Sequence, residues 1–248
     1  MKISCASNTW AQNFLVVGEV RLGIQHNIFG RIINTAGVPQ PVITIERDGI
    51  VGSPGNNFHP DVGGDPYNAS SRYTVVWHKA LLLANDIVMK QVSPSGSLVT
   101  TQPIVIANST VDERKPSISK CCGHLPGSPF WLVSYQKTNS FLPYDQNVHG
   151  RFVDFSGALA SPEFFISTFS NEDTNPVSGS PIDHFGIRKW PVVWESASAA
   201  GQPRDVVCRF VDQAGLPLTA IDFGSQIPGA DDWDPDVDSD GTRVTLTY

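Results

Sequence analysis

Four times in this sequence the chain repeats one stretch, most clearly as Asn147-Val148-His149-Gly150-Arg151-Phe152-Val153-Asp154-Phe155-Ser156-Gly157. Each copy is a β-rich run with a basic residue near its centre and a closing turn that has Asn, Asp or Ser three residues before glycine. The closing glycines, at positions 37, 96, 157 and 215, are 59, 61 and 58 residues apart. A fixed period of this size indicates a repeat architecture.

A second run of β-forming residues recurs with the same period. Its copies are rich in aromatic and β-branched residues, and most are apolar at consecutive positions, which predicts strands that are buried on both faces. Pro191 is an exception within its copy, because proline cannot donate a hydrogen bond to a β-ladder. The copies occupy residues 14–19, 73–78, 131–136, 190–195 and 243–248.

Two shorter strands complete each repeat. One begins at a proline, in copies at Pro60, Pro116, Pro176 and Pro235, with residues 2–5 as a degenerate copy. The other follows the Gly-terminated strand, at residues 42–45, 103–106, 164–167 and 219–222. Four strands in roughly sixty residues are the composition of a β-propeller blade. We therefore predict an all-β propeller of four-stranded antiparallel blades. Its repeats span about residues 1–57, 58–113, 114–173 and 174–232, with a half repeat at 233–248.

Composition limits the classes of partner. The net charge of −7 disfavours nonspecific attraction to a nucleic-acid backbone or to an anionic membrane. No apolar run approaches the roughly 20 residues that a membrane-spanning helix needs. We therefore expect no nucleic-acid partner and no membrane span. Hydrophobic residues make up 40% of the chain, which is enough to build a large core.

The repeat resembles a known family. The run from Gly150 to Gly157, followed by residues 164–166, Pro176 and residues 192–194, is similar to tandem β-propeller repeats of large secreted and cell-surface bacterial proteins. In those proteins the patterns G-R-F-V-D-x-x-G, P-x-V and V-V-W recur. The second copy departs most from the pattern, with Met89 in place of glycine and Gln91 in place of an apolar residue. The resemblance implies an extracellular or cell-surface propeller that acts as a structural, adhesion or ligand-binding module without catalysis.

Two columns of side chains recur once per repeat or more. The basic column would form either an anion-binding ring or hydrogen bonds to neighbouring blades, and we favour the second interpretation. The aromatic column would form either a sugar-stacking surface or the core between blades, and we favour the core. The basic column comprises Arg31, Lys90, Arg151 and Arg209, and the aromatic column comprises Tyr73, Trp77, Trp131, Tyr135, Trp190 and Trp194.

Trp10 and Trp233 lie outside these columns. We predict them as exposed residues that contact a carbohydrate or protein ligand. The enzymatic alternative is a propeller glycosidase, which needs two carboxylates from different blades facing one another across a pocket. Asp61 and Asp236 follow first-strand prolines, but the matching positions elsewhere are serine and valine. We therefore expect a protein without catalysis, with the glycosidase as the alternative.

An acidic segment near the C-terminus suggests a cation site. Asp231 to Gly241 contains six aspartates, and the spacing Asp-x-Asp-x-Asp-Gly can wrap oxygens around calcium. The residue where an EF-hand has its bidentate glutamate is Thr247, which weakens the match. We predict calcium as the one possible cofactor, with the ligands Asp234, Asp236, Asp238 and Asp240.

The repeat count leaves one blade incomplete. Residues 2–19 supply a first and a second strand, and residues 235–248 supply the same two strands again. The segment Arg243–Tyr248 would then be an open strand edge, which pairs with whatever strand is available. We expect its partner to be the protein's own missing blade strands or a neighbouring subunit.

Overall fold

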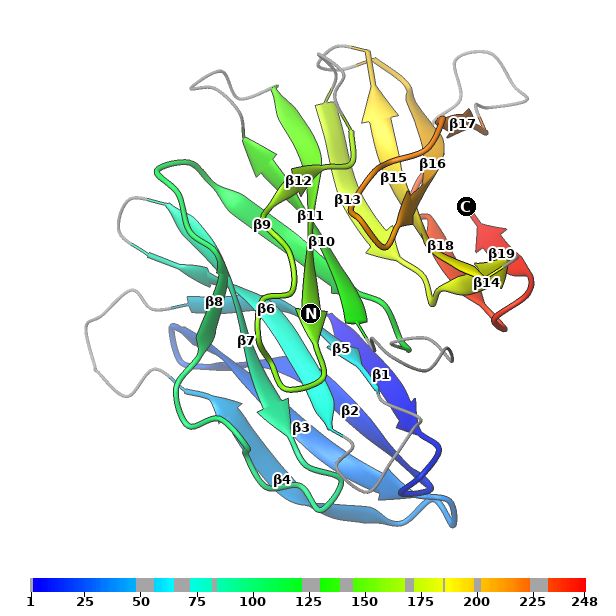
Figure 1. The fold of residues 1–248 in the computed structure, drawn as a ribbon. Coiled ribbons are helices and arrows are strands. Elements are labelled where there is room, and N and C mark those ends of the chain that lie inside the picture. Colours follow the sequence, from blue (N-terminus) through cyan, green and yellow to red (C-terminus); the bar gives the residue numbers. More distant parts are fainter. Residues whose placement is uncertain are drawn as a thin grey trace.

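The computed structural model describes residues 2–47, 56–64, 72–81, 84–121, 130–138, 145–167, 172–184, 186–198, 202–223 and 232–248. These residues form β-strands and no helix, so none of them builds a helix able to cross a membrane. The sheets fan around the middle of the molecule, from blade 1 (blue) to the last two strands (red) (Figure 1). The predicted propeller of four blades plus a half blade is confirmed.

Each blade is an antiparallel sheet whose strands follow one another in sequence order. Blade 1 contains β1 (Ile3–Asn8), β2 (Asn13–Leu22), β3 (Gln25–Asn34) and β4 (Pro39–Glu46). Blade 2 contains β5 (Asn56–Gly63), β6 (Tyr73–Ala80), β7 (Asn85–Val92) and β8 (Ile104–Ala107). Blade 3 contains β9 (Glu113–Ile118), β10 (Phe130–Thr138), β11 (Gln146–Asp154) and β12 (Phe164–Phe165).

Blade 4 contains β13 (Glu172–Ser178), β15 (Ile187–Ala197), β16 (Arg204–Asp212) and β17 (Ile221–Asp222), and the short β14 (Ile182–His184) pairs with β15. A single parallel bridge between Gln146 and Glu172 joins blades 3 and 4. The half blade, blade 5, consists of β18 (Asp236–Ser239) and β19 (Val244–Thr247). Among the described residues, no strand of blade 5 pairs with blade 1.

The turn that ends each third strand explains the repeated sequence signature. The side-chain oxygen of Asp154 accepts the backbone N–H groups of Ser156 and Ala158, and Asn34 and Asp212 bind their own turns in the same way. The closing glycines have φ between 77° and 89°. Because L side chains rarely adopt this left-handed conformation, glycine is required there.

The aromatic column lies in the cores between blades, as predicted. All six aromatic side chains are fully buried. Tyr73 and Trp77 of blade 2 pack against blade 1, and Trp131 and Tyr135 of blade 3 pack against blade 2. Trp190 and Trp194 of blade 4 pack against blade 3. The blades are therefore held together by apolar contacts that recur at one position of the repeat.

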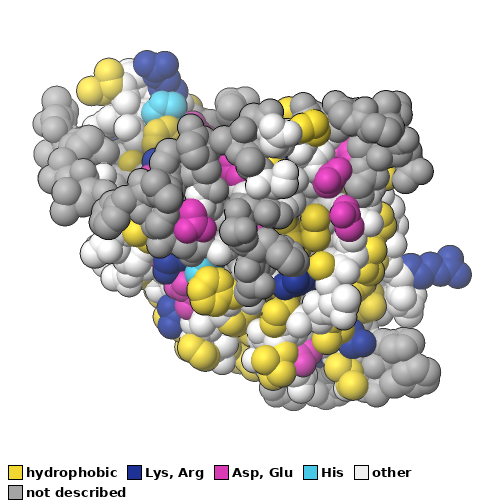
Figure 2. All heavy atoms as spheres, turned by 90° about the horizontal axis from the view of Figure 1, so that it is seen from above, with side chains coloured by type: hydrophobic (Ala, Val, Ile, Leu, Met, Phe, Trp, Pro, Cys, Tyr) yellow, Lys and Arg dark blue, Asp and Glu magenta, His cyan; other side chains and the backbone are white. Residues whose placement is uncertain are grey.

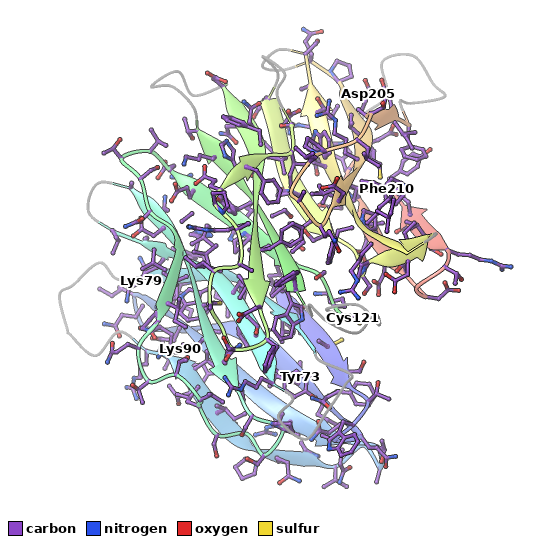
Figure 3. All side chains as sticks on the ribbon, in the orientation of Figure 1. Tyr73, Lys79, Lys90, Cys121, Asp205 and Phe210 are labelled. Atoms are coloured by element: carbon purple, nitrogen blue, oxygen red, sulfur yellow. The ribbon has the colours of Figure 1, made fainter. Side chains whose placement is uncertain are left out.

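The basic column joins the blades, as predicted. In blades 2 to 4, each basic side chain reaches back to the fourth strand of the preceding blade and donates to a backbone carbonyl there. These hydrogen bonds run from Lys90 to Ile45 (2.9 Å), from Arg151 to Ile106 (2.6 Å) and from Arg209 to Ile166 (2.7 Å). Lys90 also pairs with Glu46 at 2.6 Å, close to the Lys79–Glu46 pair (Figure 3). In blade 1, Arg31 is exposed.

Charged side chains are mixed on the surface that is visible from above. Acidic and basic groups are interspersed with apolar ones on this face, rather than gathered by sign (Figure 2). A surface of this kind creates no extended field of one sign, which agrees with the expectation from net charge that a nucleic-acid backbone is not attracted.

Candidate functional site

A pocket of about 570 Å³ lies where the first strands of the blades begin. Every blade contributes to its wall, and the half blade does so as well. The lining residues are Lys2 and Glu19 of blade 1, Phe58 and His59 of blade 2, Lys115 of blade 3, Asn175, Pro176 and Val177 of blade 4, and Asp234 and Pro235 of blade 5. A concave site built from several blades is the natural place for a ligand in this fold.

One side chain in each of blades 2 to 5 reaches the pocket from a distorted backbone. His59, Lys115, Asn175 and Asp234 each precede a first-strand proline and have φ between 49° and 54°. The strand registers of blades 2 and 4 shift at these positions. Left-handed residues other than glycine are rare and concentrate at functional sites, and β-bulges re-aim side chains. The repeat thus directs one polar side chain per blade into the pocket.

The second strands support these bulges. At one repeated position near the end of the second strand, a polar side chain accepts the backbone N–H of the bulge residue in the following blade. Glu19 accepts from His59 (3.3 Å), Gln136 from Asn175 (3.4 Å) and Glu195 from Asp234 (3.2 Å). In blade 2 the same position holds His78. These contacts fix where the pocket side chains begin.

Glu195 is the most buried of these supports. Its side chain is fully buried and accepts a hydrogen bond of 2.7 Å from the Asn175 amide. The Arg204 guanidinium lies 3.3 Å from Glu195 and 3.1 Å from Glu172. Because buried charges are stable only when paired and hydrogen-bonded, this network holds Asn175 and Asp234 in one arrangement.

The pocket combines donors and acceptors of both charges. The Lys115 ammonium donates to the Asn175 side-chain oxygen, and His26 Nδ1 lies 2.6 Å from Glu19 Oε1. Burial lowers the pKa of Lys115 and of His59, and the cations Lys2 and Lys115 lower that of His59 further. His59 is therefore neutral at pH 7. Such a wall can bind the hydroxyl groups of a polar ligand.

A second histidine lies behind the first. The rings of His59 and His78 are stacked, with centroids 5.1 Å apart. Burial, followed by His59, Arg114 and Lys115, lowers the pKa of His78 to about 3. His78 therefore stays neutral well below pH 7 and belongs to the support of the pocket rather than to its wall.

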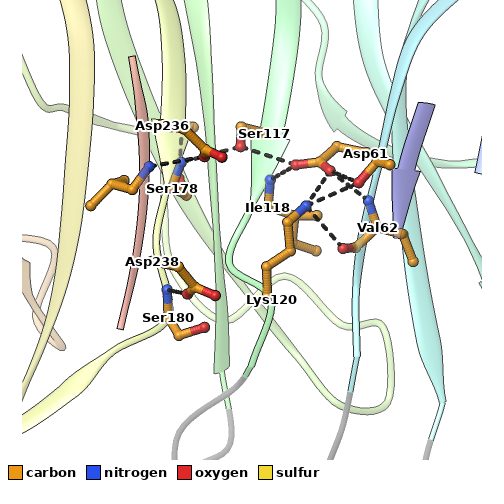
Figure 4. A network of polar contacts seen from close by, with 12 residues as sticks. Asp61, Val62, Ser117, Ile118, Lys120, Ser178, Ser180, Asp236 and Asp238 are labelled. Carbon is orange, nitrogen blue, oxygen red and sulfur yellow. Dashed lines mark hydrogen bonds and ion pairs between the residues drawn. The ribbon is translucent and has the colours of Figure 1, made fainter. Parts of the chain in front are cut away.

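Asp61 has a structural position (Figure 4). Its buried carboxylate accepts hydrogen bonds from Ser117 (3.0 Å) and the Ile118 N–H (2.9 Å), and also from Ser4 and Lys120. Burial alone would raise the pKa of Asp61, but Lys120, Lys2 and these donors lower it below its usual range. Asp61 thus ties together the first strands of blades 1, 2 and 3.

The pair of acids considered for the glycosidase alternative is therefore not the pair that the pocket presents. Neither Asp61 nor Asp236 is among the lining residues. Asp236 is exposed and its carboxylate accepts the N–H of Val237 at 2.9 Å, just as Asp61 accepts that of Val62. The carboxylates on the pocket wall are Glu19 and Asp234, from blades 1 and 5.

The four predicted calcium ligands lie at different places. Asp234 lines the pocket, Asp236 caps Val237, and Asp238 accepts the Ser180 N–H at 2.9 Å (Figure 4). Asp240 binds its own turn, and the N–H groups of Arg243 and Thr242 lower its pKa to about 2. In the described part of the chain, no three His, Cys, Asp or Glu residues form a group that could hold a metal; Asp231 lies outside that part. Calcium stays a prediction. A melting temperature unchanged by excess chelator would contradict it.

The two predicted contact tryptophans are both exposed, by 54% for Trp233 and 61% for Trp10. Trp233 is adjacent in sequence to the pocket residue Asp234, and the Arg204 guanidinium lies 5.6 Å from the centre of its ring. Trp10 follows β1, whereas the pocket residue Lys2 precedes β1, so Trp10 is at the other end of the blade. The structure thus brings Trp233 near the pocket and leaves Trp10 away from it.

The pocket residues His59, Lys115 and Asn175, and their support Glu195, were not predicted from the sequence. The available signal was the position immediately before each first-strand proline. Because histidine, lysine, asparagine and aspartate occupy it in turn, the column has no common chemistry and does not stand out.

The sequence matches no protein-family model and no curated protein. Solved structures with the same fold include an endo-arabinase from Bacteroides thetaiotaomicron, at 11% identity and a TM-score of 0.59, covering 98% of this chain and 87% of that one. An α-L-arabinanase from Penicillium chrysogenum, complexed with arabinobiose, has 11% identity and a TM-score of 0.64, with coverages of 99% and 74%. An α-L-arabinofuranosidase from Fusarium graminearum has 9% identity and a TM-score of 0.64, with coverages of 99% and 73%.

These comparisons correct one expectation from the sequence. A propeller without catalysis, acting as a structural or adhesion module, is wrong as the main interpretation, because the solved structures with this fold are glycoside hydrolases. The repeat motif reports on the architecture of the blades, and the same architecture carries many functions. At 9–11% identity the similarity shows the β-propeller fold of this chain, and its activity has to be argued from the pocket.

Proposed function

We propose that this protein is a carbohydrate-active propeller that hydrolyses a glycosidic bond in the central pocket. One observation carries the proposal: two carboxylates from different blades, Glu19 and Asp234, line the same pocket. Glycoside hydrolysis commonly uses a pair of carboxyl groups, one as the proton donor to the leaving oxygen and the other as the base or nucleophile. The fold shared with known glycosidases supports the same reaction class.

The rest of the wall suits a sugar ligand. Lys2, Lys115 and Asn175 offer groups that can hydrogen-bond to hydroxyls. Trp233 offers an exposed aromatic ring beside Asp234, on which the apolar face of a sugar can stack. In this proposal Glu19 and Asp234 perform the chemistry, and the other side chains orient the substrate.

The proposal is tested with purified protein on a panel of chromogenic furanosides and pyranosides, followed by polysaccharides. We expect hydrolysis of at least one substrate. Glu19→Gln and Asp234→Asn should each lower kcat by about 10²-fold or more, as is typical for loss of a catalytic acid or base. Azide that restores the activity of one variant would identify the residue acting as nucleophile or base.

A matched control comes from the repeat itself. Asp154 ends the third strand of blade 3, and Asn34 makes the same turn contacts in blade 1. Asp154→Asn therefore removes one carboxylate away from the pocket while keeping the turn, and should leave kcat unchanged. Wild-type protein that binds sugars but cleaves none would contradict the hydrolytic part of the proposal.

An extracellular or cell-surface location forms part of this proposal, because an enzyme that degrades polymeric carbohydrate meets its substrate outside the cell. The test is fractionation of cells that express the full natural reading frame. Protein found in the medium or on the cell surface would agree with the proposal, and protein confined to the cytoplasm would contradict it.

A further inference from the structure

Blade 1 has a sheet face that no other described part of the chain covers. Apolar side chains of β1 to β4 line a shallow groove of about 420 Å³ on this face. Ile3 and Val42, for example, are 61% and 54% exposed. Arg31 lies in the groove, opposite Val16 in the register of β2 and β3. An exposed apolar face of this kind indicates a surface that binds another protein segment.

The equivalent faces of the other blades are buried. The residues at the position of Val16 lie opposite the basic column in the same register and are fully buried against the preceding blade. They are Val75 in blade 2, Val133 in blade 3 and Val192 in blade 4. The groove on blade 1 is therefore built like three interfaces that are filled within this chain.

Arg31 lacks the partner that its equivalents have. Lys90, Arg151 and Arg209 each donate to a fourth-strand carbonyl of the preceding blade. Within the described residues Arg31 makes no hydrogen bond or ion pair, and its side chain is exposed. A guanidinium with this placement is ready to bind a carbonyl that the described chain does not supply.

The half blade has the complementary vacancy. β19 pairs with β18 and with no other described strand. Val244 and Leu246 pack on blade 4, so the half blade is seated in the ring. The Phe223 N–H donates to Val206 (2.9 Å) exactly where that of Ile166 donates to Val148 (2.8 Å). By this correspondence the Phe223 carbonyl is the acceptor for a basic residue in a third strand of blade 5.

We propose that a β-hairpin of a neighbouring polypeptide binds here and completes blade 5. The first strand of the hairpin pairs with the open edge of β19 and donates from a basic side chain to the Phe223 carbonyl. Its second strand covers the apolar face of blade 1 and presents a backbone carbonyl to Arg31. Main-chain pairing at a sheet edge provides affinity in this mode, and the apolar groove and the two basic contacts provide specificity. This inference does not rest on the proposed activity.

The chain supplies its own probe. A synthetic peptide of residues 146–167 contains β11 and β12, with Arg151 as the basic residue and Ile166 as the carbonyl donor to the next blade. The labelled peptide is titrated with intact protein and its fluorescence anisotropy is recorded. We expect saturable binding that Arg31→Ala weakens by about tenfold or more, the usual effect of a lost hydrogen bond to a charged group.

Arg21→Ala is the matched control. Arg21 is an exposed arginine of the same blade that bonds only to the turn carbonyl of Gly23, so its loss should leave the peptide affinity within about twofold. Hydrogen exchange of the wild type provides a second readout, because bound peptide should protect the amides of Val244–Thr247. Absence of saturable binding, equal affinity for wild type and Arg31→Ala, or unprotected β19 amides would each overturn the proposal. A dimer of the protein alone that Arg31→Ala dissociates would do so too, since a second copy would then occupy the face.

Discussion

The Glu195 carboxylate of blade 4 accepts a hydrogen bond of 3.2 Å from the backbone N–H of Asp234 in blade 5. The same carboxylate accepts the Asn175 amide at 2.7 Å, so one buried group fixes two residues of the pocket wall. Glu19 and Gln136 repeat the contact at two other blade boundaries. The pocket is thus shaped by a regular feature of the repeat, while its chemistry comes from residues that differ from blade to blade.

The first prediction concerns this support. Glu195→Ala leaves the Arg204 guanidinium without its buried partner and should lower the free energy of unfolding by about 3–5 kcal/mol. Glu172→Ala is the comparison, since Glu172 also pairs with Arg204 but is less buried, and its loss should be smaller. Urea denaturation measures both. Equal losses for the two variants would contradict the central role of Glu195.

The basic column provides a comparison within one molecule. Arg151→Met removes the hydrogen bond to Ile106 across the blade boundary and should cost about 1.5–3 kcal/mol of unfolding free energy. Arg31→Met removes the same residue type at the same repeat position but no such bond, and should change stability by less than about 0.5 kcal/mol in the protein alone. Chemical denaturation of the two variants distinguishes them. A large loss for Arg31→Met would show that its partner lies within this chain.

His78 should make stability depend on pH. Its pKa is lowered from 6.5 to about 3 in the folded protein, first by burial and then by neighbouring cations. Between these values the unfolded chain binds a proton that folded His78 does not, so stability falls as the pH drops below about 6.5. The slope from this one group is at most about 1.4 kcal/mol per pH unit.

His78→Gln isolates this contribution, because glutamine occupies the same position in blade 3 as Gln136. We expect the variant to lose less stability than the wild type between pH 7 and pH 5, as measured by urea denaturation at each pH. Parallel losses in the two proteins would mean that His78 takes up a proton without cost in the folded state.

Asp61 should act in the acid range. Its pKa is lowered in the folded protein, because Lys120, Lys2 and the hydrogen-bond donors outweigh the effect of burial. The stability that it contributes is present above the unfolded value of about 4 and is lost as the pH falls below it. Asp61→Asn should cost about 2 kcal/mol or more at pH 7, because Lys120 loses its carboxylate partner. The cost should shrink towards pH 3 in acid titrations followed by tryptophan fluorescence; a cost independent of pH would contradict this assignment.

The sequence predicted the fold well because the repeat is written in local signals. Glycine at positive φ after the turn of Asp154, the apolar runs around Trp131 and Trp194, and the basic column each have one physical cause that acts in every blade. The pocket could not be found in this way. Its side chains converge only through left-handed bulges such as those at His59 and Asn175, and convergence of this kind depends on the assembled ring.

The same difference explains the error in function. The resemblance rested on residues that build blades, such as Gly150 and Val192, and these carry no information about chemistry. The acids considered from the sequence followed the prolines, and Asp61 proved to tie strands together. The residue that reaches the pocket wall, Asp234, stands one position before its proline.

The most direct test of the central claim is the rate of release of reducing sugar from the best substrate of the panel, measured for the wild type, Asp234→Asn and Asp154→Asn. The account predicts a rate that Asp234→Asn lowers by about 10²-fold or more and that Asp154→Asn leaves unchanged. Release of sugar at the wild-type rate by Asp234→Asn, with the protein folded, would contradict a catalytic site in this pocket.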